Sequence, residues 1–219
     1  MRPLTGMTLG LVLMIGGSVI AAGQASAAEK LSHAHMGHVT TAWNDTPDGQ
    51  GLLPTAIAEA KIAAQHAAFA IQKPSDLAWM KLHAAHVLNA VDATLQAKGP
   101  GLGYGVVKAA GGTAKHINFA ANSDDASDNV RAHARHVATA AQNTLARAAE
   151  IAALCQKVST ADNAEQAAAL MQQVATLGNQ LLAGVDANGD GAISWEQGEG
   201  GLNIANQHMG FMEQGEGMN

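Results

Sequence analysis

The sequence predicts an all-α protein whose centre is an up-down four-helix bundle. Long alanine-rich stretches alternate with short turn segments, and alanine is the strongest helix former. One helical hairpin is present twice, because residues 51–98 align with residues 101–148 without a gap. Both copies carry two histidines three residues apart, a spacing that puts them on one face of a helix.

The chain opens with a segment, residues 1–27, that is typical of a signal peptide. Arg2 precedes an apolar run, and Ala25, Ser26 and Ala27 form a small-residue cleavage signature. We expect cleavage near Ala27 and export to a periplasm or to the cell exterior. An uncleaved membrane anchor is the alternative. In the mature chain no stretch approaches the roughly 18 apolar residues that cross a bilayer, so no membrane span is expected there.

The next segment, residues 28–54, is polar and rich in turn residues, so we expect an irregular leader. It contains a group of side chains that could capture copper as a secondary site, since copper accepts both imidazole and thioether ligands. These are His33, His35, Met36 and His38. A polar linker with incidental histidines is the alternative interpretation.

Five helices are expected after the leader, at about residues 55–72, 76–97, 106–121, 127–157 and 164–183. Pro74 ends the first helix, because the residue before a proline disfavours the α region. Ser75 can cap the second helix. The first four helices make the bundle, residues 55–158. The fifth begins a C-terminal segment, residues 159–219.

The internal repeat aligns histidines as well as alanines. At an offset of 50 residues, 14 of 48 positions are identical. The matched histidines are His66 with His116, His83 with His133, and His86 with His136. Each hairpin therefore carries one histidine on its first helix and a His-x-x-His pair on its second.

Hairpin geometry predicts that the three histidines of one copy converge. His66 and His83 are equidistant from the turn at Pro74 and Ser75, so an antiparallel hairpin puts them at the same height. His86 follows roughly 4.5 Å farther along its helix. If the second hairpin does the same and both turns lie at one end of the bundle, all six histidines occupy one slab.

Six histidines placed in this way predict a transition-metal site, either one six-histidine cluster or two His₃ sites. The candidate ligands are His66, His83, His86, His116, His133 and His136. Imidazole ligands without carboxylates suit copper or zinc better than magnesium or calcium. A carboxylate-bridged di-iron site is disfavoured, because no acidic residue recurs in the repeat. Packed or solvent-facing histidines are the alternative.

Several functions are compatible with such a site. We favour a metal-binding protein for storage, delivery or sensing over a copper-dependent redox or oxygen-binding enzyme. A non-covalent bis-His haem is a further alternative, although alanine-rich helices favour close approach over a wide slot. In drawing three histidines per metal ion from a pair of helices, the sequence resembles coupled binuclear copper proteins of the haemocyanin and tyrosinase type. Their histidine pairs are typically spaced by four residues instead of three.

Residues 186–197, DANGDGAISWEQ, resemble the EF-hand calcium loop. The resemblance implies calcium ligands at Asp186, Asn188, Asp190, Ala192, Ser194 and Gln197. Gly191 stands at the sharp turn, but Gln197 replaces the bidentate glutamate of the last position. Glu196 and Glu199 are neighbours that could substitute. We expect weak calcium binding or a structural turn, and a calcium-stabilised interaction protein is the corresponding alternative function.

Metal ions are the expected partners, and composition argues against one other class of partner. A net charge of −6 and an aromatic content of 3% argue against nucleic acid. The single cysteine, Cys155, excludes an internal disulfide and is expected in the core. Near the C-terminus, methionines at 209, 212 and 218 beside His208 are expected to pack in a helix, with copper capture as the alternative. No protein partner is indicated.

Overall fold

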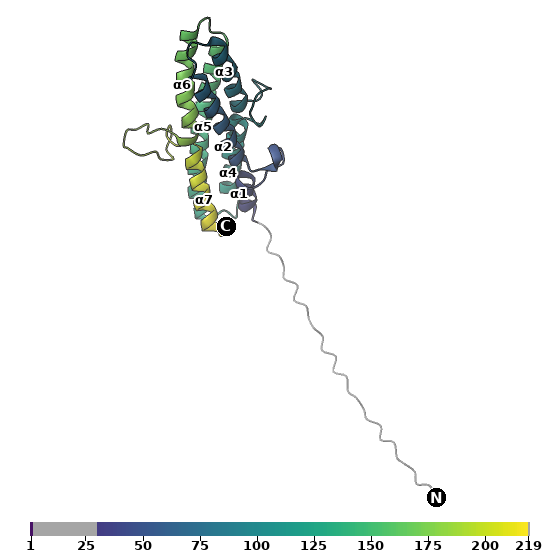
Figure 1. Cartoon of the computed structure of the whole chain (residues 1–219). Coiled ribbons are helices and arrows are strands. Elements are labelled where there is room, and N and C mark those ends of the chain that lie inside the picture. Colours follow the sequence, from purple (N-terminus) through teal and green to yellow (C-terminus); the bar gives the residue numbers. More distant parts are fainter. Residues whose placement is uncertain (2–29, 219) are drawn as a thin grey trace.

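The computed structural model describes Met1 and residues 30–218, and the predicted signal peptide lies outside the described residues except for Met1. The described part is all-α, as predicted. Its helices are α1 (Leu31–Thr40), α2 (Leu52–Ala70), α3 (Leu77–Val91), α4 (Val106–Asn122), α5 (Asp128–Ser159), α6 (Ala164–Ala183) and α7 (Leu202–Glu216), with a 3-10 turn at Pro47–Gly49 (Figure 1). In this part of the chain, no helix is both long enough and apolar enough to span a membrane.

Local side-chain chemistry sets the ends of α3. The expected cap was Ser75, but the carboxylate of Asp76 accepts a hydrogen bond from the Trp79 amide at 2.9 Å. The helix stops at Val91, earlier than predicted, because Asp92 adopts an extended backbone conformation. The Asp92 carboxylate then accepts from the Thr94 amide, a turn that competes with helix continuation.

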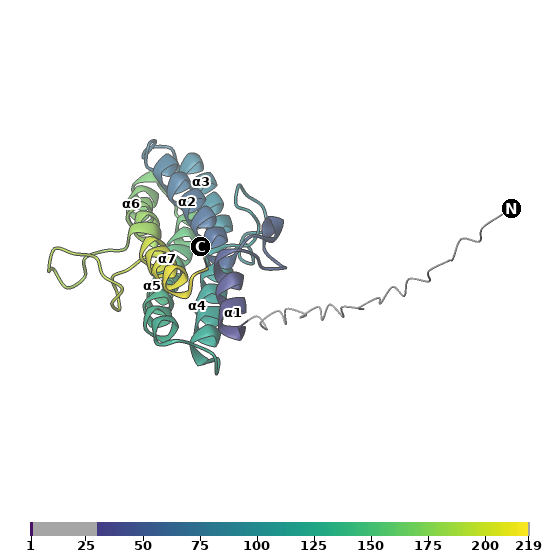
Figure 2. The ribbon, with the colours of Figure 1, turned by 90° about the horizontal axis from the view of Figure 1, so that it is seen from below.

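The longest helix, α5, runs along the molecule and is shared by two groups of helices. Helices α2, α3 and α6 pack with it into a four-helix arrangement, in which α6 stands where the sequence had placed α4. Helix α4 packs on α5 as predicted, but its other main neighbours are α1 and α2. Figures 1 and 2 show α1 beside α4 and α7 beside α5, away from the end where α3 lies.

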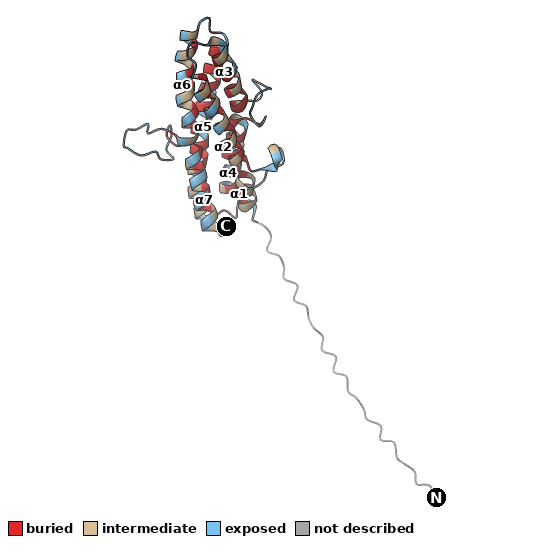
Figure 3. Ribbon diagram, in the orientation of Figure 1, coloured by how far each residue is buried: buried red, intermediate tan, exposed pale blue. Residues whose placement is uncertain are grey.

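The helices approach closely because their buried faces are alanine-rich, and Figure 3 shows these faces turned inward. Gly178 on α6 illustrates the spacing. A Cβ atom at this position would stand 3.3 Å from the Ala64 backbone of α2. Interiors are close-packed, so even one added methyl group requires the neighbouring helix to shift.

The leader is not irregular, and that prediction was wrong for residues 31–40, which form α1. Its helical pattern is weak, but Ser32, Met36 and Val39 are buried on one face. The first turn of α1 is capped from outside, since the Asp125 carboxylate accepts hydrogen bonds from the amides of Leu31 and Ser32. Packing against the rest of the fold therefore stabilises α1, whose own sequence has only a weak helical pattern.

Buried polar side chains anchor the connections between helices. The Glu59 carboxylate is fully buried and accepts hydrogen bonds from the amides of Leu102, Tyr104 and Gly105, which fixes the loop that leads into α4. Arg147 on α5 donates to the carbonyls of residues 198–200 just before α7. These anchors determine where α4 and α7 begin, and so where their histidines lie.

Candidate metal centres

Nine of the ten histidines gather into three groups of three. We call them the α1–α4 triad (His35, His38 and His116), the α2–α3 triad (His66, His83 and His86) and the α5–α7 triad (His133, His136 and His208). In each triad, one helix supplies a His-x-x-His pair and a second helix supplies the remaining histidine. We call that histidine the central one: His116, His66 and His208.

The same ring atom converges in all three triads. Nδ1 of His66 lies 2.9 Å from Nδ1 of His83 and 3.3 Å from Nδ1 of His86. The corresponding distances from His208 in the α5–α7 triad are 3.0 and 3.3 Å. Both distances from His116 in the α1–α4 triad are 3.2 Å. Three separate pairs of helices therefore produce nearly the same arrangement of nitrogens.

Hydrogen bonding alone cannot satisfy this arrangement. A neutral imidazole nitrogen carries either a proton or a lone pair. Nδ1 of a central histidine therefore has a single proton or a single lone pair to share between two Nδ1 neighbours, so only one of the two contacts can be a full hydrogen bond. A cation that accepts all three lone pairs satisfies the whole triad.

Burial keeps the central histidines neutral. Burial, together with a smaller contribution from repulsion by the two neighbouring imidazoles, lowers the pKa of His66, His116 and His208 to about 4. Burial, with repulsion from His86 and Lys73, also lowers the pKa of His83, and its Nε2 is buried without a hydrogen-bond partner. At neutral pH these side chains therefore present lone pairs and do not repel a cation as imidazolium.

Aromatic rings border every triad, and they include all three tryptophans and all three phenylalanines of the chain. Trp79 lies 4.2 Å from His83 and Trp195 lies 4.1 Å from His136, measured between ring centroids. Trp43 lies 4.4 Å from His116. The phenylalanines follow the central histidines by three residues, at positions 69, 119 and 211, and their ring centroids lie 5.4–5.7 Å from them.

The structure brings the predicted histidines together in one hairpin and separates them in the other. His66, His83 and His86 converge between α2 and α3 as expected. His116 does not meet His133 and His136, although α4 and α5 form a hairpin. Equal distance from a turn sets the height of a residue but not its direction around the helix axis. His116 points toward α1, whereas His133 and His136 point toward α7. The six histidines thus form neither one cluster nor two hairpin sites.

The three histidines of α1 have two different roles. His35 and His38 belong to the α1–α4 triad. His33 instead donates to the Glu216 carboxylate at 3.0 Å, which ties α1 to the end of α7. Met36 is fully buried in the core and contributes no exposed thioether. The predicted capture group of His33, His35, Met36 and His38 therefore does not form one site.

His208 was not predicted as a principal ligand, although the sequence contained a signal for it. A His-x-x-Phe pattern occurs at His66, His116 and His208, and it marks the central histidine of each triad. The His-x-x-His pattern likewise occurs three times, if the pair at 35 and 38 is included. The expected packing of the nearby methionines is confirmed for Met209 and Met212, whereas Met218 is exposed. Cys155 is buried, and burial raises its pKa to about 12.

The predicted calcium loop lies exposed between α6 and α7 and has no regular structure. The Asp186 carboxylate accepts hydrogen bonds from the amides of Gly189 and Gly191 at 2.7 and 2.9 Å. Asp190 similarly accepts from the Ala192 amide. Gln197 lies beside α5 and lines a pocket there, and the buried Glu199 accepts from the Ser194 amide.

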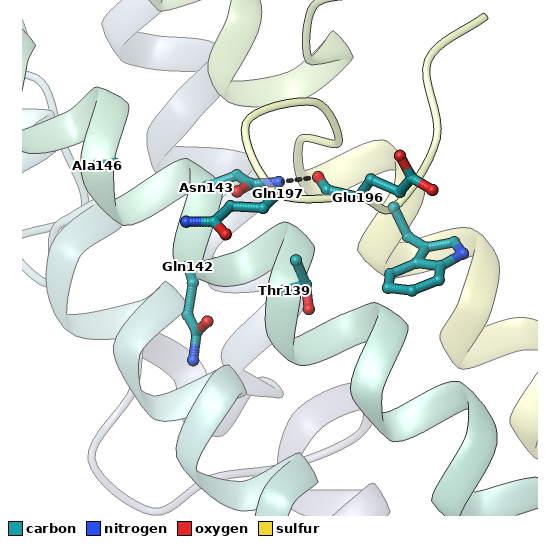
Figure 4. Close-up of a pocket in the computed structure, with 7 residues that line it drawn as sticks. Thr139, Gln142, Asn143, Ala146, Glu196 and Gln197 are labelled. Atoms are coloured by element: carbon teal, nitrogen blue, oxygen red, sulfur yellow. Dashed lines mark hydrogen bonds between the residues drawn. The ribbon is translucent and has the colours of Figure 1, made fainter. Parts of the chain in front are cut away.

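This pocket has a volume of about 650 Å³ and is lined by residues of α5 and by residues 195–197. Asn143 of α5 donates to the Glu196 carbonyl across one side of it (Figure 4). The Asn143 side-chain oxygen also accepts from the Gly198 amide. Together with Arg147, Asn143 holds the segment that carries Trp195 against α5.

Comparisons with protein-family models, with characterised proteins and with solved structures found no match. The geometry of the triads is therefore the main indication of function. That geometry does not suit haem, because axial histidines stand on opposite faces of a macrocycle, whereas here three nitrogens converge within hydrogen-bond distance. It suits a single small ion in each triad.

Proposed function

We propose that the protein binds transition-metal ions of the copper and zinc class, one in each His₃ triad, and serves in their storage, delivery or sensing. The observation that carries this proposal is the convergence of three Nδ1 atoms in each of three triads, at 2.9–3.3 Å from the central histidine. Metal–imidazole bonds of about 2.0 Å in tetrahedral geometry separate two ligand nitrogens by about 3.3 Å.

The signal-like sequence at residues 1–27 places this activity outside the cytoplasm in our proposal. A metal ion that is held only by three histidines keeps a fourth coordination position open for water or a substrate, so a metalloenzyme is the alternative. Storage, delivery or sensing is favoured because the triads are three near copies. An enzyme needs one elaborated centre with groups that act on a substrate, whereas repetition of a simple site raises metal capacity.

The proposal is tested by metal analysis of protein without an affinity tag, reconstituted with copper or zinc and freed of excess ion. We expect about three ions per chain for the intact protein. Each of the variants His66→Gln, His116→Gln and His208→Gln should lose about one ion, because each change removes the central ligand of one triad.

His33→Gln is the matched control, since His33 is the one histidine outside the triads, and this variant should keep all three ions. Equal stoichiometry in all four variants would contradict the proposal, because the bound metal would then lie elsewhere. Circular dichroism of each variant checks that a lost ion reflects a lost ligand and not an unfolded chain.

We propose calcium as a second, independent ion for the loop at residues 186–197. The pattern of Asp186 and Asp190, with their carboxylates turned toward the loop amides, supports this proposal. A calcium titration monitored by calorimetry should detect weak binding to the intact protein. The Asp186→Asn variant should lose this binding. No heat with the intact protein would reduce the loop to a structural turn.

A further inference from the structure

Copper can bind as the monovalent ion Cu(I), whereas Zn²⁺ and Cu²⁺ are divalent, and the surroundings of the triads bear on that difference in charge. The three groups of potential ligands found in the described residues consist of histidine alone. Three neutral imidazoles leave the full charge of a bound ion uncompensated, and a divalent ion then carries twice the uncompensated charge of Cu(I). Uncompensated charge in a partly buried site is costly.

A cationic side chain stands next to each triad. Lys73 lies over the Trp79 ring of the α2–α3 triad at 3.8 Å from its centroid. Arg135 lies over the Trp195 ring of the α5–α7 triad at 5.1 Å, and Lys115 lies over the Phe119 ring of the α1–α4 triad at 5.6 Å. Each of these cations repels a divalent ion twice as strongly as a monovalent one.

The aromatic borders act in the same direction. Zn²⁺ in a His₃ site takes a fourth ligand, usually water, to complete a tetrahedron. A tryptophan and a phenylalanine stand against the imidazoles of every triad. Aromatic faces attract cations but offer no lone pair and no hydrogen bond to an ordered water. They therefore suit an ion that needs only three ligands.

We infer that the triads select the monovalent ion Cu(I) over divalent ions, with Lys73, Lys115 and Arg135 as the side chains that discriminate against the higher charge. This inference rests on the proposed function, because it names the ion that the same triads take. The repetition of one cation, one tryptophan and one phenylalanine at three triads on different helix pairs is the observation behind it.

The test compares affinities for Cu(I) and Zn²⁺ under anaerobic conditions, each measured by competition with a chromophoric chelator. For the intact chain we expect three Cu(I) ions bound far more tightly than Zn²⁺. In the triple variant Lys73→Gln, Lys115→Gln and Arg135→Gln, the Zn²⁺ affinity should rise by about tenfold more than the Cu(I) affinity, allowing for screening at partly exposed charges.

The matched control removes the same charge from three lysines that do not lie over an aromatic ring of a triad. Lys61, Lys98 and Lys157 are exposed, and their simultaneous replacement by glutamine should leave the ratio of the two affinities within about twofold of the intact chain. Tryptophan emission provides a second readout, since each tryptophan borders one triad, and it should fall as Cu(I) binds.

The outcomes separate this inference from the proposed function. Equal or tighter binding of Zn²⁺ at the triads, or an unchanged affinity ratio in the triple variant, would overturn the Cu(I) inference and leave metal binding intact. Failure of both ions to bind, or binding that survives loss of the central histidines, would overturn the proposed function itself.

Discussion

At the scale of single residues, the central histidines decide how each triad behaves. Each faces two other imidazoles through the same nitrogen, so neutral side chains leave at least one contact unsatisfied. Without metal, the protein therefore contains these unsatisfied contacts, and burial increases their cost in free energy. The metal-free state is thereby the less stable one, and its stability should depend on pH through these residues.

The pKa values of His66, His116 and His208, about 4 in the folded chain against 6.5 ordinarily, set the sign of this dependence. Below 6.5 the unfolded chain takes up protons that the folded chain accepts only near 4. The stability of the metal-free protein is therefore complete above about pH 6.5 and falls as the pH drops toward 4.

Thermal melting of the metal-free protein should show this effect as a lower Tm at about pH 5 than at about pH 7.5. In the variant that replaces all three central histidines by glutamine, the decrease should be smaller, because glutamine takes up no proton. A Tm difference of the same size in both proteins would show that other groups control the acid response.

Glu216 is the acidic counterpart of these histidines. Hydrogen bonds from Ser127, His33 and Asn129 hold its pKa at about 2. Its contribution to stability is present above its ordinary pKa and is lost only as the pH falls toward 2. The acid response between about pH 6.5 and 4 thus belongs mainly to the histidines.

At the scale of the helices, two of the triads fasten terminal elements to the rest of the fold. The α1–α4 triad joins α1 to α4, and the α5–α7 triad joins α7 to α5. Both terminal helices are short, and α1 has a weak helical pattern of its own. A metal ion in each triad should therefore stabilise them against local opening.

Hydrogen exchange measures this fastening directly. With free metal at about 100 times its Kd, a helix that opens only when its ion leaves should exchange about 100-fold more slowly. We expect this slowing in α1 and α7. Helix α6 supplies no triad histidine and is the internal control, where exchange that reports local opening should change little. Uniform slowing in all helices would indicate a global effect instead.

Prediction from sequence succeeded where neighbours along the chain are neighbours in space. The α2–α3 hairpin is joined by a short turn, so the positions of His66, His83 and His86 followed from their spacing. The α1–α4 and α5–α7 triads join helices far apart in the chain. The partners of His116 and His133 depended on how α1 and α7 dock, which the alanine-rich faces do not specify.

The wrong prediction of an irregular segment at residues 31–40 also arose from contacts between segments that are far apart in the chain. Residues 31–40 have weak helical patterning, and the first-turn amides are satisfied by Asp125 from a distant turn. The recurrence of the His-x-x-His and His-x-x-Phe patterns was nevertheless present in the sequence. It indicated three equivalent sets of ligands, although it could not indicate which His-x-x-His pair meets which central histidine.

At the scale of the whole molecule, the fold holds three copies of one arrangement on a shared frame. Helix α5 supports the α5–α7 triad and also packs against α3 and α4, which belong to the other two. The sites draw on separate histidines, so each should fill without requiring the others. Capacity for several ions, rather than a single reactive centre, is the property that this architecture provides.

The most direct test of metal binding at the triads is anomalous diffraction from crystals of the protein loaded with copper. We expect three strong peaks per chain, each about 2.0 Å from the Nδ1 atoms of one triad. Copper bound through Nε2 atoms, at surface carboxylates, or between histidines of different triads would contradict it. So would unoccupied triads in crystals grown with excess metal.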